Sequence, residues 1–319
     1  AAPKRVHVIG AGTMGADIAT WAVLSGLEAS LQDLSADAIA TALARAKKQF
    51  RRRYRKTAEV DAAIARLVAD PTGAHVSRAD VVIEAIVEKL EAKQSLFKEL
   101  EAKLKPGAVL ATNTSSIPLE EIARPLADPG RLIGIHFFNP VSLMPLVEIV
   151  RGGSSREDEV RKGCTFVTTI GKFPLIVKSA PGFLVNRVLG PYLQEAINRL
   201  DAPIGTGRRT RDDIDEAAKV FGMPMGPLEV ADTVGLDICA HVAEMLGMAG
   251  DPSQGKRLRE LVEKGKLGKK TGEGFYVWKD GKPERGTTEM SAGDLGKLGE
   301  ELMRPLIAEC EKALSDRVV

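Results

Sequence analysis

Arg5-Val-His-Val-Ile-Gly-Ala-Gly-Thr-Met-Gly15 decides the fold of this chain, because a short apolar run leads at once into three glycines spaced GxGxxG. Apolar residues then recur at helical spacing from Met14 to Leu24, and a second strand-like stretch covers residues 28–34. A strand, a glycine loop that opens a helix, and another strand form the first βαβ unit of a dinucleotide-binding sheet.

The glycine loop is predicted to hold a pyrophosphate. Gly10 permits the tight turn, Gly12 lets the backbone approach the phosphates, and Gly15 lets the helix pack closely on the sheet. The helix then begins at Thr13 and Met14, where free backbone N–H groups favour an anion. These residues are therefore expected to bind the cofactor.

Asp33 lies near the end of the second strand, about 20 residues beyond the loop. A carboxylate there accepts hydrogen bonds from the adenosine ribose, and it would repel a 2′-phosphate. No arginine follows it directly. The pattern predicts NAD rather than NADP as the cofactor. The alternative is that Asp33 merely caps the next helix.

The rest of the first half alternates strands with helices. Strands are expected near 81–83, 109–111, 133–138, 146–150 and 174–178, and helices near 37–56, 59–69, 88–104 and 156–170. This alternation predicts an α/β fold with a Rossmann-type, mostly parallel sheet covered on both faces.

Beyond Pro181 the pattern is nearly all helical, so an all-α C-terminal domain is expected. The predicted organisation is a cofactor-binding domain at 1–180 and a helical substrate and dimerisation domain at 181–280. The polar stretch 280–294 suggests a linker. Residues 303–314 match 189–200 in their prolines, glutamates and apolar positions, so 281–319 is predicted to be a linker and the start of a second helical repeat.

Composition narrows the functional class. The chain has 319 residues with 44% hydrophobic residues, and a formal net charge of +2 argues against nucleic acid or an anionic membrane as partner. Its three cysteines are scattered, so neither a disulfide framework nor a metal site is predicted, and a cytoplasmic location is expected. No apolar run reaches the length of a membrane span. The basic run 51–56 is either a solvated helix face or a site for a phosphorylated ligand.

His136 is the candidate catalytic residue. Of the four histidines, it is the one placed at the carboxyl end of a sheet strand, where open α/β sheets bind their ligands. Oxidation of an alcohol needs a base for the hydroxyl proton, and imidazole suits this near neutral pH. Taken alone, a histidine at a strand end is more often structural.

Two companions strengthen the assignment of His136. Glu148 ends the next strand-like segment and could fix the imidazole tautomer, as the acid does in a hydrolase triad. Ser115, in Asn113-Thr-Ser-Ser116, could place a hydroxyl near the same substrate oxygen. Taken singly, Glu148 is more often a surface salt bridge, and Ser115 is more often a helix N-cap.

Six ordered motifs together resemble the L-3-hydroxyacyl-CoA dehydrogenases, over about residues 4–278. They are the glycine loop at 10–15, Asn113–Ser116, His136-Phe-Phe-Asn-Pro140, Pro181-Gly-Phe183 with Asn186-Arg187, Phe221–Pro227 and Lys270–Tyr276. The resemblance implies that His136 is the general base and Glu148 its partner, and that Ser115 and Asn186 hold the substrate oxygen.

The resemblance also implies further contacts to NAD besides the glycine loop. The matching positions are Asp33, Glu88, Lys93, Asn113, Asn139 and Lys270. The alternatives are that Lys93 pairs with an acid on its own helix and that Asn139 caps a turn before Pro140.

The implied activity is the NAD-dependent oxidation of (S)-3-hydroxyacyl-CoA to 3-ketoacyl-CoA in fatty-acid β-oxidation. The opening residues look most like the dehydrogenase portion of bacterial multifunctional fatty-acid oxidation enzymes, so the chain is expected to be a fragment of a longer one. Its partners would be an acyl-CoA and either a second copy, through the helical domain, or other domains of that longer chain. The loop 201–211, with Gly205 and Gly207, is longer than the family usually has.

Alternative functions stay open. The chain could be a 3-hydroxybutyryl-CoA dehydrogenase of a short-chain pathway, or a β-hydroxyacid dehydrogenase acting on a free acid. It could belong to a lens-protein or sugar-acid branch of the same superfamily. A truncated NAD-binding fragment with little activity is the alternative from a different class.

Overall fold

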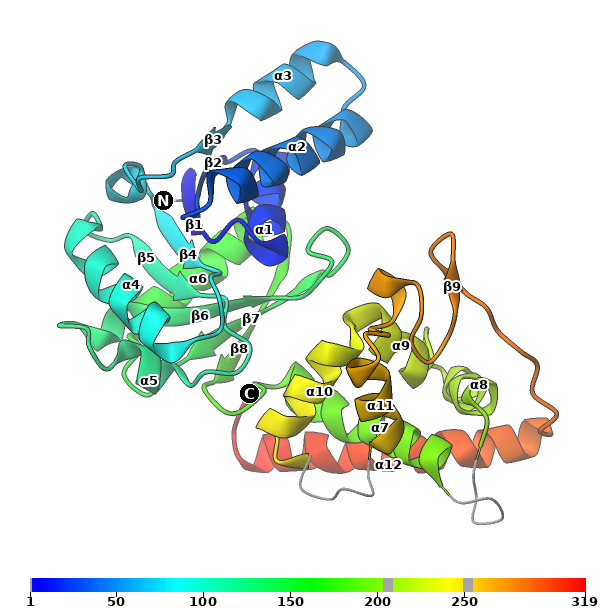
Figure 1. Ribbon diagram of the computed structural model, residues 1–319. Helices are drawn as coiled ribbons and strands as arrows, with labels where there is room; N and C mark the ends of the chain where they lie inside the picture. The colour runs from blue at the N-terminus through cyan, green and yellow to red at the C-terminus, as the bar shows by residue number, and fades with distance from the viewer. Residues whose placement is uncertain (1, 203–208, 249–254) are drawn as a thin grey trace. The chain divides into compact units, whose positions relative to one another are not determined.

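A computed structural model describes residues 2–202, 209–248 and 255–319 of the chain, which fold into two compact units. The first unit runs to Phe183 and also holds Val319, and the second runs from Leu184 to Val318 (Figure 1). Residues 203–208, which include Gly205 and Gly207 of the unusually long loop, lie outside the described residues. No helix within the described ranges is long and apolar enough to cross a membrane.

An eight-stranded sheet forms the centre of the first unit, in the order β3-β2-β1-β4-β5-β6-β7-β8. Its strands are β1 (Arg5–Ile9), β2 (Glu28–Gln32), β3 (Leu67–Ala69), β4 (Val81–Glu84), β5 (Val109–Thr112), β6 (Leu132–Phe137), β7 (Leu146–Arg151) and β8 (Phe173–Lys178). Neighbours pair in parallel except β6 and β7, which are antiparallel. The predicted mostly parallel, Rossmann-type sheet is therefore confirmed.

Helices cover both faces of this sheet. One face packs against α1 (Thr13–Leu24), α2 (Ala36–Arg53) and α6 (Glu157–Thr169), through buried residues such as Ile18, Ile39 and Val160. The other face packs against α4 (Leu90–Lys103) and the short α5 (Leu119–Ala123), through Phe97 and Ile122. Both layers are visible in Figure 1. Apolar side chains on both faces explain why the central strands are continuous apolar runs.

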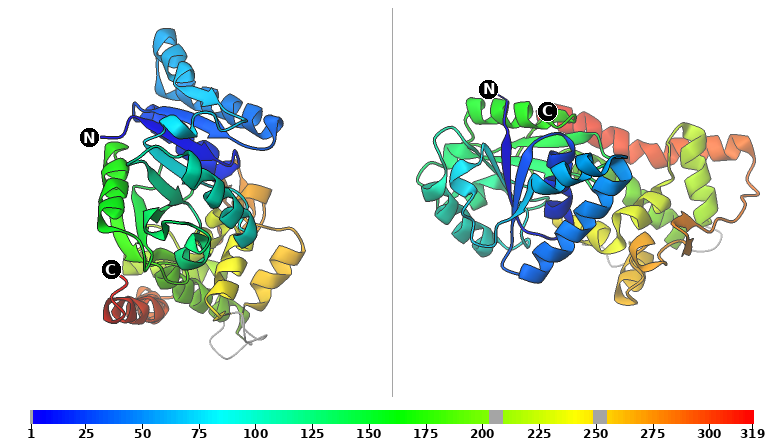
Figure 2. Two further views of the ribbon diagram at one scale, coloured as in Figure 1. Left: turned by 90° about the vertical axis from the view of Figure 1, so that its left-hand side faces the viewer. Right: turned by 90° about the horizontal axis from the view of Figure 1, so that it is seen from above.

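One predicted element of the first unit is wrong in part. The expected helix at 59–69 is α3 (Thr57–Ala65) followed by strand β3 at Leu67–Ala69, which pairs with β2. A three-residue edge strand is too short to show the alternation that identifies strands in a sequence. Helix α3 packs against α2, and the pair projects at the top of the left-hand view of Figure 2.

The second unit is helical, as predicted for the C-terminal part. Its helices are α7 (Val185–Asp201), α8 (Arg211–Phe221), α9 (Pro227–Val234), α10 (Leu236–Met245), α11 (Lys256–Glu263) and α12 (Ala292–Ser315). They enclose a core of their own that includes Tyr192, Leu228 and Leu302.

The segment predicted as a linker and second repeat belongs to this helical unit. Residues Trp278–Lys279 (β9), at the end of the predicted helical domain, and Lys282–Pro283 (β10), in the predicted linker, form a small antiparallel hairpin that was not expected. Helix α12 packs along α7 and α8, and Arg187 of α7 pairs with Glu309 of α12 at 2.6 Å. That α12 begins a second copy of the repeat stays a prediction.

Candidate active site

The carboxyl ends of the parallel strands bring most of the predicted residues of the first unit to one edge. The glycine loop follows β1, Asp33 follows β2, Asn113 follows β5, and His136 is the second-last residue of β6. The direction in which successive strands are added to the sheet reverses between β1 and β4. Open α/β sheets bind ligands in the crevice at such a point.

The glycine loop has the geometry of a pyrophosphate cradle. Gly10 has φ of 106°, and a Cβ there would lie 2.3 Å from the carbonyl oxygen of Ala85. A Cβ on Gly15 would lie 1.9 Å from the carbonyl oxygen of Gly10. By contrast, apart from the adjacent residues of the chain, no described atom lies within 4 Å of the Cβ position of Gly12, and no described side chain caps helix α1 there. The N-terminus of α1, with Thr13 and Met14, therefore faces open space that fits the phosphates of a dinucleotide.

Asp33 joins the end of β2 to this loop. Its Oδ2 accepts a hydrogen bond from the N–H of Ala11 at 2.7 Å, and its Oδ1 accepts one from the N–H of Ser35 at 2.9 Å. The N-cap of α2 is Ser35, whose hydroxyl accepts from Ala38. Asp33 is therefore not the cap itself, and its carboxylate lies against the glycine loop, where the ribose of a dinucleotide is expected.

His136 and Glu148 face each other across the antiparallel pair of β6 and β7. They are partners in the strand register, so their side chains lie on the same face of the sheet. Nδ1 of His136 lies 2.8 Å from Oε2 of Glu148. Glu148 is fully buried at 0% exposure, so the alternative of a surface salt bridge is wrong.

The pairing with Glu148 favours one tautomer of His136. An ionised carboxylate only accepts hydrogen bonds, so a neutral imidazole paired with it carries its proton on Nδ1 and keeps the lone pair of Nε2. The side chain of His136 is 7% exposed, and its ring packs edge-on against Phe138 and Phe183, at ring-centroid distances of 4.6 and 5.4 Å. The arrangement presents one basic nitrogen in a fixed orientation.

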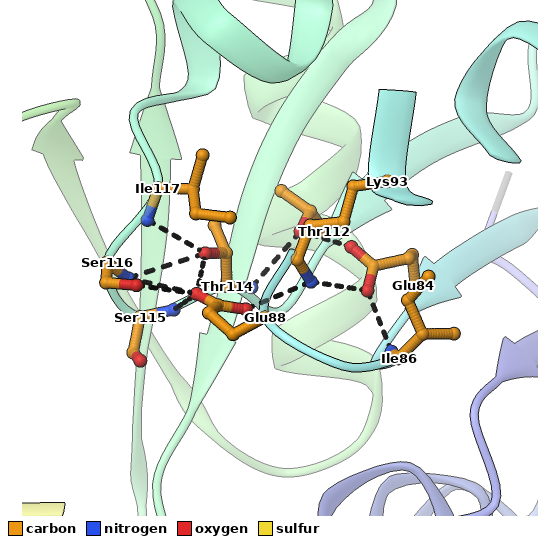
Figure 3. Close-up of polar contacts among 9 residues, drawn as sticks. All are labelled: Glu84, Ile86, Glu88, Lys93, Thr112, Thr114, Ser115, Ser116 and Ile117. Carbon is orange, nitrogen blue, oxygen red and sulfur yellow. Dashed lines mark hydrogen bonds and ion pairs between the residues drawn. The ribbon is translucent and has the colours of Figure 1, made fainter. Parts of the chain in front are cut away.

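Ser115 lies in a tight turn after β5. Oε1 of Glu88 accepts hydrogen bonds from the backbone N–H groups of Ser115 and Ser116, at 3.2 and 3.3 Å. In Figure 3 the hydroxyl of Ser115 points away from that carboxylate. The N-cap of α5 is Pro118, so the alternative that Ser115 caps this helix is wrong. Beside the turn, Oδ1 of Asn113 accepts from the N–H of Phe137 at 2.9 Å, which ties β5 to the residue after His136.

Lys93 is buried between two carboxylates. Its Nζ lies 2.6 Å from Oε1 of Glu84 and 3.1 Å from Oε2 of Glu88 (Figure 3). The alternative that Lys93 pairs with a nearby acid is confirmed in part, because Glu88 lies in the predicted helix 88–104, although α4 itself begins at Leu90 and the second acid, Glu84, ends β4. Burial acts to raise the pKa of Glu88, but the Lys93 ammonium and hydrogen bonds from Thr114 and Ser116 hold that pKa below its usual range. Glu84 was not predicted from the sequence, although an acid that closes the apolar run of β4 is a usable signal.

Three further predicted residues lie in the loop after β6 or in the second unit. Asn139 is exposed in the loop that follows β6. In the second unit, Asn186 lies in the first turn of α7, and Nζ of Lys270 pairs with both oxygens of Asp237, at 2.6 and 2.7 Å. The basic residues Arg51–Arg53 end α2 and are exposed, so their predicted role toward a phosphorylated ligand stays a prediction.

Comparison with known proteins assigns both parts of the chain. Residues 5–180 match the family model for the NAD binding domain of 3-hydroxyacyl-CoA dehydrogenase, and residues 182–278 match the model for its C-terminal domain. The resemblance stated from the motifs is therefore confirmed.

Individual relatives point to two kinds of protein. The chain is 40% identical over 288 residues to a 3-hydroxybutyryl-CoA dehydrogenase of Bradyrhizobium diazoefficiens, covering 88% of this chain and 97% of that one. It is 34% identical to a fatty acid oxidation complex subunit alpha of Ectopseudomonas oleovorans, covering 99% of this chain but 44% of that one. The crystal structure of M. tuberculosis FadB2 superposes with a TM-score of 0.80 at 36% identity, covering 88% of this chain and all of the other.

Proposed function

This chain belongs to the 3-hydroxyacyl-CoA dehydrogenase family, an NAD-dependent group of oxidoreductases, and from that premise we propose that it oxidises short-to-medium (S)-3-hydroxyacyl-CoA in fatty-acid β-oxidation. The observation that carries the proposal is the buried His136–Glu148 pair at the carboxyl edge of the sheet. The pair supplies a base of fixed tautomer on the same edge as the glycine loop.

In the proposed mechanism, Nε2 of His136 accepts the proton of the 3-hydroxyl while the C3–H bond breaks. NAD, when bound along the glycine loop, supplies the acceptor for the hydride that leaves C3. Glu148 stabilises the imidazolium that forms. The hydroxyl of Ser115 and the side chain of Asn186 would donate hydrogen bonds to the substrate oxygen as negative charge develops there. In the reverse direction, the same imidazolium returns the proton to the 3-keto oxygen.

A substrate comparison tests the proposed function. We expect NADH oxidation, followed at 340 nm, with acetoacetyl-CoA and with 3-ketohexanoyl-CoA, and no turnover of free acetoacetate. Equal turnover of the free acid would instead favour the β-hydroxyacid dehydrogenases. NADH binding without turnover of any thioester would favour a non-catalytic cofactor-binding domain.

A specific observation favours a second candidate function, 3-hydroxybutyryl-CoA dehydrogenase of a short-chain pathway. The Bradyrhizobium relative carries that name and is covered over 97% of its length. The two candidates differ in chain-length preference. A kcat/KM that falls steeply from acetoacetyl-CoA to longer 3-ketoacyl thioesters would support the short-chain role, and a flat or rising series would support β-oxidation.

Asp33 should set the preference for NAD over NADP. Asp33→Asn keeps a hydrogen-bond acceptor for Ala11 but removes the charge that would repel a 2′-phosphate. We expect the NADH-to-NADPH ratio of kcat/KM to fall by about tenfold or more, which corresponds to about 1.4 kcal/mol.

The matched control for Asp33 is Glu28→Gln, which removes a carboxylate from the opposite end of the same strand, where it pairs with Arg5. It should leave the ratio unchanged. An Asp33→Asn enzyme with the wild-type ratio would show that selectivity comes from elsewhere in the site.

A further inference from the structure

A chain of three charged residues reaches from the sheet to the Ser115 turn; it begins at the buried Glu84, continues through the buried Lys93 and ends at Glu88, whose side chain is 32% exposed. Glu84 ends β4 and is 0% exposed. Its Oε1 accepts hydrogen bonds from Nζ of Lys93 at 2.6 Å and from the N–H of Ile86 at 2.8 Å. Its Oε2 accepts one from the hydroxyl of Thr112 at 2.6 Å. Three donors, one of them charged, compensate the cost of burying this carboxylate.

The ammonium group of Lys93 also pairs with Glu88. The side chain of Lys93 is 1% exposed, so the ammonium depends on its two carboxylate partners rather than on solvent. Glu88 uses Oε2 toward Lys93 and Oε1 toward the turn. That second oxygen accepts hydrogen bonds from the hydroxyls of Thr114 and Ser116 and from the N–H groups of Ser115 and Ser116 (Figure 3).

The position of Glu88 depends on how Lys93 is shared between the two acids. If Glu84 lost its charge, the buried ammonium would keep one charged partner, Glu88, and would attract it more strongly. Removing one partner of a buried ionic cluster leaves the other charge undercompensated, which is destabilising, and a stronger attraction between Lys93 and Glu88 would reduce that cost. Glu88 would then shift toward α4, and Oε1 would leave the donors of the Ser115 turn.

We propose that Glu84 is a positioning residue for the dehydrogenase reaction, which acts through Lys93 and Glu88 to hold the hydroxyl of Ser115 in its working orientation. The inference rests on the proposed function, because it assigns Ser115 a contact with the substrate oxygen. It also gives Lys93 and Glu88 a task besides their predicted contacts with NAD, and it explains why Lys93 is fully buried.

A double-mutant cycle tests whether Glu84 acts through the hydroxyl of Ser115. The variants are Glu84→Gln, Ser115→Ala and the double variant, and kcat is measured with saturating NADH and acetoacetyl-CoA. We expect Ser115→Ala to lower kcat on the order of a hundredfold. Glu84→Gln should lower kcat on the order of tenfold through misplacement of the turn. Because both act on one hydroxyl, the double variant should match Ser115→Ala alone. A kcat reduced by the product of the two single factors would overturn the proposal.

The matched control is Glu159→Gln on α6, a carboxylate with a side chain 4% exposed that pairs with Arg156 and Lys162. It should lower the melting temperature without changing kcat. If Glu84→Gln does not fold, Glu84→Asp replaces it in the cycle, because it keeps the charge but withdraws the carboxylate from Lys93. A wild-type kcat in a folded Glu84 variant would also overturn the proposal.

A readout that does not depend on turnover separates this inference from the proposed function. Amide hydrogen exchange of residues 113–117 should be faster in Glu84→Gln than in wild type, and unchanged in Glu159→Gln. Unchanged exchange at the turn would overturn the positioning role even in an active enzyme. Absence of turnover by the wild type with any 3-ketoacyl-CoA would contradict the proposed function alone.

Discussion

Replacing His136 with alanine should lower kcat for acetoacetyl-CoA by roughly two to four orders of magnitude, while NADH still binds. The imidazole is the proposed base and is buried at the carboxyl edge of the sheet. Its Nδ1 lies 2.8 Å from Oε2 of Glu148. Alanine removes the group that gives and takes the proton, and leaves the glycine loop and Asp33 intact. The loss should therefore appear in kcat, and the dissociation constant of NADH should stay close to the wild-type value.

Single-turnover kinetics measure the loss in the chemical step, and a fluorescence titration measures the dissociation constant of NADH. His241→Ala is the control, because His241 is an exposed histidine on α10. It should keep wild-type kcat. A His136→Ala enzyme that retains more than about a tenth of the activity would exclude His136 as the general base, since such a base contributes at least about a hundredfold.

Glu148→Gln should have the second-largest effect, with kcat lowered by roughly two to four orders of magnitude at nearly unchanged KM. Glutamine has the volume of glutamate, so the packing around this fully buried position is preserved. The amide lacks the charge that stabilises an imidazolium, and its NH₂ group can impose the wrong tautomer on His136. The effect is expected on the chemical step rather than on binding.

Steady-state kcat and KM for acetoacetyl-CoA, with the melting temperature measured alongside, separate catalysis from stability. Glu159→Gln again serves as the control for loss of a buried carboxylate. If Glu148→Gln kept kcat within about threefold, imidazolium stabilisation by Glu148 would contribute less than about 0.7 kcal/mol to the barrier. The mechanism would then rest on His136 without an acidic partner.

Local patterns were sufficient for the first βαβ unit. The glycine spacing, the apolar run before it and the acid after it are constraints within 30 residues, and each has a direct steric or electrostatic cause. Gly10 and Gly15 illustrate this, because any Cβ there would collide with backbone carbonyl oxygens. Strand β3 was missed for the opposite reason. It is three residues long, and its pairing with β2 identifies it more clearly than its own sequence does.

Residue types and motif order therefore determined the fold class, the cofactor and the family of this protein. The sequence also proposed Glu148 as the partner of His136 and an acid near Lys93, whereas the tertiary structure alone decided the geometry of these contacts and the second partner of Lys93, Glu84. That Glu148 faces His136 follows from the antiparallel register of β6 and β7, and a shift of one residue would turn the carboxylate to the other face. Lys93 of α4 lies between Glu84, which ends β4, and Glu88, which lies in the segment that joins β4 to α4. Such contacts depend on side chains that the sheet brings together. The interactions between charged groups are stronger at buried positions because the local dielectric constant is low.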